Sequence, residues 1–304
     1  MSHAIETRGL GYRAGKRFEI RDLELRIPQG SIYGFLGANG SGKTTTMHLV
    51  LGLLRADRGT IEVLGHEIPE DVVRVNARTG FVPERPHLYR SLTIDETLGY
   101  ESAFYSHWDA GRASQLIDAF GLDRDRRVGR LSKGETGQLM VLLALARSPE
   151  LLVLDEPTDG LDPVVRRDIL AALLDYVSQR EATVFISSHL VHELERVCDW
   201  VGVIDDGRMV AEMPMQVFKE GIKRLRVTDA PEVIGDPPFE ILGRERTDGL
   251  SGAEVWVVRG WEAPMKGYFG DIGANLRETI DLDLEEGFVE LLRTARASRG
   301  EEVS

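Results

Sequence analysis

The sequence has little cysteine: Cys198 is the single cysteine among 304 residues. A lone cysteine excludes an internal disulfide, which agrees with a reducing compartment. Cys198 shares one helical face with Val191, Leu194 and Val197, since residues three and four positions apart lie together on a helix. We therefore predict that Cys198 simply packs in a core.

Long apolar runs are also missing. The longest, Leu139–Ala146, has less than half of the length that a helix needs to cross a bilayer. Residues Met1–Arg13 mix His, Glu and Arg and contain no apolar segment typical of a signal peptide. We expect a cytoplasmic chain that does not itself span a membrane.

Positive charge is scarce as well. The formal net charge is -13 and the pI is near 5.1. Nucleic-acid phosphates are neutralised by clustered Lys and Arg, so this balance argues against a nucleic acid as partner, although a local basic patch stays open. Only six residues are lysines, which makes each lysine inside a motif more informative.

The length favours two domains. The 304 residues exceed the usual span of one domain, and 42% hydrophobic with 29% charged residues is ordinary for a folded globular protein. We assign residues 1–212 to a large domain and residues 213–304 to a small accessory or dimerisation domain.

The large domain starts with two extended runs and continues with alternating strands and helices. The runs Ile5–Tyr12 and Phe18–Ile27 lead to a turn at Pro28, which predicts an antiparallel beginning. The strand predicted at Ile32–Leu36 is followed by a helix over Lys43–Leu54. Later strands are predicted at Thr60–Leu64, Gly80–Pro83, Leu151–Leu154, Thr183–Ser187 and Val201–Asp205, with helices at Pro163–Ser178 and Val191–Cys198. This alternation predicts an α/β fold with a mostly parallel sheet and ligands beyond the carboxyl ends of its strands.

Two further regions complete the predicted architecture. Residues from about 93 to 147 form a helical insert, because a capping box at Thr93 and Glu96 opens a helical pattern over Asp95–Ala119. The small domain is predicted to be α+β. Its strands are expected at Lys223–Thr228, Phe239–Arg246, Glu254–Gly260 and Asn275–Asp281, and its helices at Met215–Glu220, Glu262–Phe269 and Leu284–Ala297.

A glycine-rich segment between the first parallel strand and its helix carries the strongest motif. It matches G-x-x-x-x-G-K-[ST], in which backbone amides wrap phosphates, the lysine reaches the β and γ oxygens and the hydroxyl binds Mg²⁺. A glycine-rich turn with an incidental Lys-Thr pair is the alternative, and the strand and helix around the motif argue against it. The expected nucleotide ligands are Gly37, Ala38, Asn39, Gly40, Ser41, Gly42, Lys43, Thr44 and Thr45.

A pair of carboxylates stands at the end of the predicted buried strand Leu151–Leu154. Asp155 is placed to hold Mg²⁺ together with Thr44, and Glu156 is placed to polarise the attacking water as general base. Taken alone, the pair fits a solvated strand end equally well, but the P-loop favours the metal interpretation.

The segment Leu131-Ser132-Lys133-Gly134-Glu135 opens another helix. Ser132 as N-cap with Glu135 three residues later makes a capping box. A helix N-terminus also presents amides and positive dipole to a phosphate, and the two interpretations are compatible.

The order of five motifs resembles the nucleotide-binding subunits of ABC transporters, over about Ile5–Met213. The motifs are the P-loop, Leu131-Ser132-Lys133-Gly134, Leu151-Leu152-Val153-Leu154-Asp155-Glu156-Pro157, Asp159-Gly160-Leu161-Asp162 and His189. The resemblance implies a P-loop ATPase core that binds ATP and Mg²⁺ and pairs with a second ATP-binding subunit.

The resemblance also implies residue roles. Tyr12 would stack on adenine, with simple packing at a strand end as the alternative. His189 would sense the γ-phosphate, although it could be an ordinary loop histidine. In the other subunit's site, Ser132, Lys133, Gly134 and Glu135 would act as the signature, and Asp159 and Asp162 belong to a loop at the dimer interface.

Three residues depart from the family pattern. Glu84 stands where glutamine is common, and its carboxylate can still reach the water shell of the metal. Lys133 replaces the usual second glycine of the signature. Glu135 replaces glutamine and would place negative charge near phosphate unless the capping box turns it away.

We therefore expect an ATPase subunit that drives a separate membrane permease from the inner face of the cell membrane. Residues from about Glu84 to Tyr105 are the expected permease contact by resemblance. The segment Leu282–Val289 resembles the closing segment of exporter subunits, which favours export, but a small amphipathic helix that completes a core explains it as well. The alternative function is a soluble ABC-type ATPase with a non-transport or regulatory role, whereas a GTP switch is disfavoured because no lysine lies in an Asn-Lys-x-Asp context.

Overall fold

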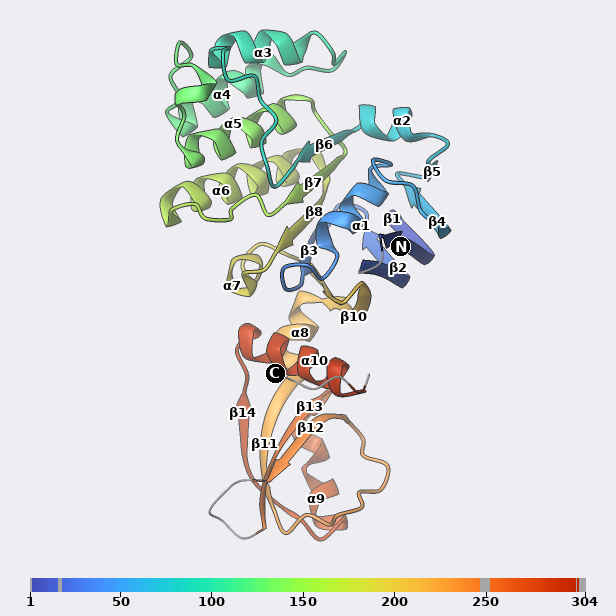
Figure 1. Cartoon of the computed structure of the whole chain (residues 1–304). Coiled ribbons are helices and arrows are strands. Elements are labelled where there is room, and N and C mark those ends of the chain that lie inside the picture. The colour runs from blue at the N-terminus through green and yellow to red at the C-terminus, as the bar shows by residue number, and fades with distance from the viewer. Residues whose placement is uncertain (1, 16–17, 247–251, 299, 301–304) are drawn as a thin grey trace. The chain divides into compact units, whose positions relative to one another are not determined.

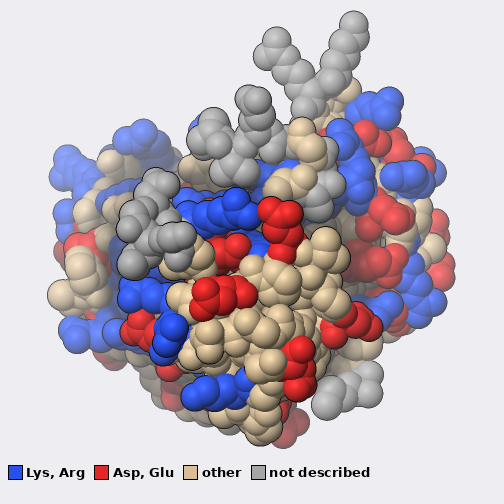
Figure 2. Space-filling view, turned by 90° about the horizontal axis from the view of Figure 1, so that it is seen from below, with Lys and Arg blue, Asp and Glu red and all other residues tan. Residues whose placement is uncertain are grey.

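The computed structural model describes residues 2–15, 18–246, 252–298 and 300 (Figure 1). The chain divides into two compact units, Met1–Met209 and Val210–Ser304. Within the described ranges, no helix is both long enough and apolar enough to cross a bilayer. On the face shown in Figure 2, Lys and Arg side chains lie interspersed with Asp and Glu side chains.

The first unit begins with a four-stranded sheet in the order β2-β1-β4-β5. Its strands are β1 (His3–Ala14), β2 (Phe18–Pro28), β4 (Arg58–Val63) and β5 (His66–Ile68). All three pairings are antiparallel, which confirms the predicted beginning. Along β2, buried Leu23, Leu25 and Ile27 alternate with exposed Glu24 and Arg26, a pattern that gives the sheet one apolar face.

The second sheet of this unit is the one that positions the site. Its order is β10-β9-β3-β8-β7-β6. The strands are β3 (Ile32–Leu36), β6 (Thr79–Val82), β7 (Leu151–Asp155), β8 (Thr183–Ser188), β9 (Trp200–Asp205) and β10 (Arg208–Pro214). The pairings β3–β8, β3–β9, β6–β7 and β7–β8 are parallel. Every residue of β3, β7 and β8 is buried, as expected of parallel strands covered on both faces.

One hydrophobic core joins the two sheets around α1 (Lys43–Val50). It contains Ile5 and Leu25 from the antiparallel sheet, Phe35 and Phe185 from the parallel sheet, and Met47 from the helix, all of them 0% exposed. Because this core holds α1 against both sheets, the loop before the helix is fixed between them.

The remaining helices of the first unit include a stack formed by α3, α4, α5 and α6 (Figure 1). The helices are α2 (Val72–Ala77), α3 (Ile94–Ser102), α4 (Ala110–Phe120), α5 (Lys133–Ala146), α6 (Pro163–Arg180) and α7 (Val191–Leu194), with a 3-10 turn η1 (Val128–Arg130). Helix α5 packs against α3, α4 and α6. The helical stretch predicted over Asp95–Ala119 is two helices, because Asp109 caps a new start by accepting a hydrogen bond from the Arg112 amide.

Other boundaries also differ from the prediction. Helix α1 ends at Val50 rather than Leu54: Gly52 has φ 67°, and the Leu53 amide donates to His48 O at 2.8 Å. This pattern is a Schellman motif, which ends a helix. Strands β5 and β10 and helix α2 were not predicted, and α7 ends four residues before Cys198. Cys198 is buried, as predicted, and burial raises the pKa of its thiol.

The second unit is a small α+β structure. Its antiparallel sheet has the order β12-β13-β11-β14. The strands are β11 (Ile222–Thr228), β12 (Glu240–Arg246), β13 (Ala253–Arg259) and β14 (Asn275–Asp281), and the helices are α8 (Met215–Gly221), η2 (Ala263–Lys266), α9 (Gly267–Asp271) and α10 (Leu284–Ser298). The core includes Trp256, Phe239 and Phe269. The predicted fold class, a P-loop-type α/β core with an α+β appendage, is confirmed.

A polar cluster is buried in the sheet of the second unit. Glu254, 7% exposed, bonds Arg244 through both carboxylate oxygens and accepts from Trp256 Nε1 at 2.8 Å. Arg244 also donates to the carbonyl of Pro231 at 2.7 Å. Burial opposes ionisation of Glu254, but the hydrogen bonds from Arg244 and Trp256 outweigh burial and lower the pKa of its carboxyl. The ionised pair therefore stabilises this unit.

We expect Glu254→Gln to lower the free energy of unfolding of the second unit by about 2 kcal/mol at neutral pH, because the partner Arg244 loses its buried counterion. The pKa of Glu254 is lowered on folding, so its stabilisation is present above the ordinary carboxyl pKa and is lost as pH falls through the folded value. Hydrogen exchange of the β13 amides at neutral and acidic pH measures both effects.

Glu240→Gln on the neighbouring strand is the matched control, since its pair with Arg259 is 50% exposed on the Glu240 side. Equal exchange rates in the two variants, or a Glu254→Gln effect that persists in acid, would contradict the assigned role of Glu254.

Candidate functional site

A cavity of about 790 Å³ lies in the first unit, where α1 begins and where β7 and β8 end. Residues from five separate segments line it. They are Ala14, Phe18, Asn39, Gly40, Gly42, Lys43, Thr44, Thr45, Glu84, Glu156, Asp159 and His189. The structure thus brings together the P-loop, Glu84, Glu156 and His189, which the sequence spreads over about half of its length.

The P-loop joins β3 to α1 and holds its lysine inside the loop. Lys43 Nζ donates to Gly37 O at 2.7 Å and to Ala38 O at 3.2 Å. Gly42, the N-cap of α1, has φ 116°, and a Cβ there would lie 2.8 Å from Ile20 Cδ1. No side chain caps α1, and no acidic residue occupies its first turn. The positive end of the helix dipole is therefore open toward the cavity, an arrangement suited to anionic phosphate.

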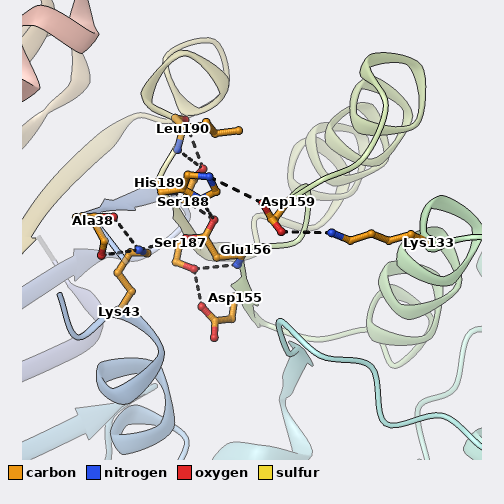
Figure 3. A network of polar contacts seen from close by, with 11 residues as sticks. Ala38, Lys43, Lys133, Asp155, Glu156, Asp159, Ser187, Ser188, His189 and Leu190 are labelled. Carbon is orange, nitrogen blue, oxygen red and sulfur yellow. Dashed lines mark hydrogen bonds and ion pairs between the residues drawn. The ribbon is translucent and has the colours of Figure 1, made fainter. Parts of the chain in front are cut away.

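Glu156 occupies the centre of the polar network in Figure 3. Its Oε1 lies 3.2 Å from Lys43 Nζ, and its Oε2 lies 2.9 Å from His189 Nδ1. The side chains of Lys43 and Glu156 are 6% and 10% exposed. Glu156 has φ 49°, which is uncommon for a residue with a side chain and marks a constrained turn after β7. The carboxylate is held between the ammonium of Lys43 and the imidazole of His189 at the edge of the cavity.

Asp155 is oriented by Ser187, a residue that sequence reasoning did not single out. Ser187 Oγ donates to Asp155 Oδ1 at 2.7 Å and accepts from the Glu156 amide at 2.9 Å. Asp155 is 1% exposed. The sequence feature that indicates Ser187 is a hydroxyl residue at the carboxyl end of the predicted strand Thr183–Ser187, since neighbouring parallel strands bring such ends together. Ser187 thus connects both carboxylate residues.

Tyr12 does not line the cavity. It is half-buried and packs against the core of the first unit, opposite Ile20 in the β1–β2 pairing. Ala14 and Phe18, from the same hairpin, line the cavity in its place. The stacking role of Tyr12 stays a prediction, and Phe18 is the aromatic residue that this structure places at the cavity.

The N-terminus of α5 carries the predicted signature. Ser132 Oγ accepts from the Glu135 amide at 3.1 Å, and Glu135 Oε2 accepts from the Ser132 amide at 2.8 Å, so the predicted capping box is formed. Arg126 Nη1 lies 2.5 Å from Glu135 Oε1. The hydrogen bond from the Ser132 amide and the charge of Arg126 hold the pKa of the Glu135 carboxyl below its ordinary value. Neither Ser132, Lys133, Gly134 nor Glu135 lines the cavity of its own chain.

The two acidic residues of the loop after β7 have different surroundings. Asp159 lines the cavity and has one oxygen 3.9 Å from His189 Nε2 and the other 3.3 Å from Lys133 Nζ. Asp162 is the N-cap of α6 and accepts from the amides of Val164 and Val165. Its side chain is therefore used to begin a helix, with Pro163 in the first turn.

A parallel sheet with a P-loop, an uncapped helix after it and a carboxylate beside its lysine defines a P-loop nucleotide-hydrolysing protein. The ABC transporter family model matches residues 20–159. The bacitracin transport ATP-binding protein BcrA of Bacillus licheniformis is 32% identical over 302 residues, which cover 96% of this chain and 98% of that protein.

A second relative is the Nod factor export ATP-binding protein I of Burkholderia orbicola, which is 37% identical over 213 residues and is matched over 68% of this chain and 70% of its own. A solved ATP-binding subunit of an ABC transporter superposes with a TM-score of 0.64 at 24% identity, over 71% of this chain and 92% of the other. The chain belongs to the ATP-binding subunits of ABC transporters, and it is an ATPase of that family. The predicted resemblance is confirmed.

We expect Ser187→Ala to lower ATP turnover by roughly one to two orders of magnitude, because a buried hydrogen bond to a charged group contributes about 1.5–3 kcal/mol. The substitution leaves the Glu156 amide without its partner and frees Asp155 to rotate. Steady-state ATPase assays of the full chain measure the loss.

Ser31→Ala is the matched control, because Ser31 is a buried serine at the other end of the parallel sheet, where its hydroxyl donates to the Pro28 carbonyl at 2.7 Å. Unchanged turnover in Ser187→Ala would contradict the positioning role of Ser187.

Proposed function

We propose that this chain binds MgATP between its own P-loop and the signature segment of a second subunit, and that hydrolysis drives export through a separate membrane permease. One observation carries the hydrolytic part: Glu156 lies between Lys43 and His189 in the cavity that the P-loop lines. This geometry supports the proposal, because a carboxylate lies beside the ammonium that would bind the phosphates.

Lys43 and Glu156 have complementary tasks in this proposal. The ammonium of Lys43 is held by loop carbonyls and by Glu156, and charged phosphate oxygens would bond the same ammonium more strongly than the neutral carbonyls do. Once Lys43 turns to phosphate, the carboxylate of Glu156 is released to accept a proton from water. His189 keeps the other oxygen of that carboxylate oriented.

The donor set is compatible with Mg²⁺. This ion prefers oxygen ligands and retains several waters when it binds one or two carboxylates and phosphates. Thr44 and Glu84 line the cavity, and Asp155 is the buried residue that directly precedes Glu156, which also lines it. Within the described ranges, no group of three or more His, Cys, Asp or Glu side chains could hold a metal by itself. We therefore assign the ion to the Thr44 hydroxyl, to Asp155 and Glu84 through water, and to the phosphates, whose charge it neutralises.

The position of α5 supports a site shared between two subunits. Ser132 and Gly134 at its N-terminus do not line the cavity that Lys43 lines. The capping box pairs Ser132 with Glu135 within the chain. The positive end of the helix dipole remains at this N-terminus. The occupant that fits is the γ-phosphate of ATP held by the second subunit.

An aromatic ladder supports a permease contact. Tyr89, Tyr100 and Phe104 are 59%, 41% and 65% exposed. Tyr100 packs edge-on against both neighbours, with centroid distances of 5.3 Å and 5.1 Å. The ladder lies on the loop and helix that follow Glu84, within the segment expected to contact the permease. Exposed contiguous aromatic side chains are typical of protein-binding surfaces.

The names of the relatives support the export part of the proposal. The name of one relative includes Nod factor export and that of another bacitracin transport, which favours a transporter over an ATPase with a non-transport role. The segment Leu282–Val289 follows β14 directly and includes the start of α10 at Leu284. We accordingly place the chain at the inner face of the cell membrane, bound through its permease.

We expect Glu156→Gln to retain ATP binding, to lower turnover at least about a hundredfold and to accumulate an ATP-bound dimer, because the amide cannot accept the proton of the attacking water. ATPase assays, nucleotide-binding titrations and size-exclusion chromatography with light scattering measure the three properties.

Glu150→Gln at the start of the same strand is the control, since Glu150 pairs with Arg78 on the surface. Hydrolysis by Glu156→Gln at the parent rate would show that the base is another group.

The permease proposal predicts that Phe104→Ser reduces recovery of the chain with membrane protein after extraction in mild detergent, while ATP affinity stays unchanged. The reason is that Phe104 is at the exposed end of the ladder and far along the chain from the P-loop. Quantitative immunodetection of the chain in detergent-purified complexes measures the loss.

Val73→Ser on α2 is the matched control, because Val73 is 79% exposed and lies outside the ladder. Recovery of the parent chain only as a free, partnerless species would count against the transporter proposal as a whole.

A further inference from the structure

We propose that Lys133 is a positioning residue for ATP hydrolysis in its own subunit, acting through Asp159 and His189 on Glu156. The inference rests on the proposed function, in which Glu156 is the general base. Lys133 would thus act on the site of its own chain, whereas its neighbours Ser132 and Gly134 are proposed to act in the site of the second subunit.

The first step is the contact between Lys133 and the loop after β7. Lys133 is the first residue of α5, and its Nζ lies 3.3 Å from Asp159 Oδ2. A Cβ added to Gly160 would lie 2.4 Å from the same Nζ, so the ammonium rests directly against the backbone of this loop. Two independent contacts thus join the start of α5 to residues 159 and 160.

The second step is the path from this loop to the cavity. Asp159 Oδ1 lies 3.9 Å from His189 Nε2, and His189 Nδ1 lies 2.9 Å from Glu156 Oε2. Glu156 Oε1 in turn lies 3.2 Å from Lys43 Nζ. Figure 3 shows the side chains in sequence, with Lys133 at one end and Lys43 at the other. Acidic and cationic or imidazole groups alternate along the whole path.

The third step is a competition for His189. Its ring has a carboxylate on either side, Glu156 at Nδ1 and Asp159 near Nε2, and the contact with Asp159 is the longer of the two. Lys133 attracts the carboxylate of Asp159 from the opposite direction. Without the charge of Lys133, Asp159 is drawn to His189, and the imidazole moves away from the carboxylate that it orients.

The size of the effect follows from exposure. The side chains of Lys133 and Asp159 are 63% and 46% exposed, so their pair contributes little to folding. Lys43, in contrast, keeps its bonds to Gly37 and Ala38 whatever happens at Lys133. The expected consequence is a lower kcat with an unchanged KM for ATP and an unchanged Tm.

The test is a double-mutant cycle on the full chain with Lys133→Met, Asp159→Asn and the two combined. We expect Lys133→Met to lower kcat about three- to fivefold, the size of one exposed charge pair, with binding of a fluorescent ATP analogue unchanged. Because Lys133 acts through Asp159, the double variant should match Asp159→Asn alone. Lys133→Arg, which keeps the charge, should retain at least half of the parent kcat.

Lys266→Met, which removes one exposed lysine of the second unit, is the control for loss of a positive charge. The inference would be overturned if Lys133→Met lowered the kcat of Asp159→Asn by the same factor as it lowers the kcat of the parent chain. Lys133 would then act independently of Asp159, as it would on a nucleotide in the second subunit.

Glu156→Gln is assayed in the same series to separate the two failures. Loss of turnover in Glu156→Gln together with an additive cycle rejects the role of Lys133 alone. Parent-level turnover in Glu156→Gln rejects the proposed function on which that role depends.

Discussion

The ion contact between Lys43 and Glu156 joins the P-loop to the end of β7, and the other groups of the site are arranged around it. Both side chains are almost completely buried, and a buried charge is strongly unfavourable without a partner. The lysine neutralises the carboxylate while the cavity holds no competing anion. The loop, the strand end and His189 therefore form one electrostatic unit, and any anion that enters the cavity must act on all three.

The parallel register explains why these groups meet. Leu36 pairs with Ser188, and Asp155 pairs with Ser187, so the ends of β3, β8 and β7 lie at one edge of the sheet. A shift of one residue in any of these pairings would turn the adjacent side chains to the opposite face. The fully buried apolar strands hold this register, and packing of the core thereby determines the geometry of the charged edge.

Much of this arrangement could be predicted from the sequence, because motifs at the ends of parallel strands indicate which residues meet at one edge of the sheet. The P-loop, Asp155, Glu156 and His189 were found in that way. Contacts that depend on the direction of a side chain could not be predicted from the sequence. Ser187 was passed over because a serine in a buried strand carries no local pattern, and the positions of Phe18 and Tyr12 relative to the cavity depend on irregular register in the β1–β2 pairing.

The charges at the start of α5 show how departures from a family pattern can be absorbed. Glu135 would repel phosphate as a free carboxylate, but the capping box and Arg126 engage both of its oxygens. Lys133 would add a positive charge, but Asp159 lies 3.3 Å from its ammonium. Each substituted charge has a counterion in the same chain, so neither substitution adds an unpaired charge to the positive end of the helix dipole.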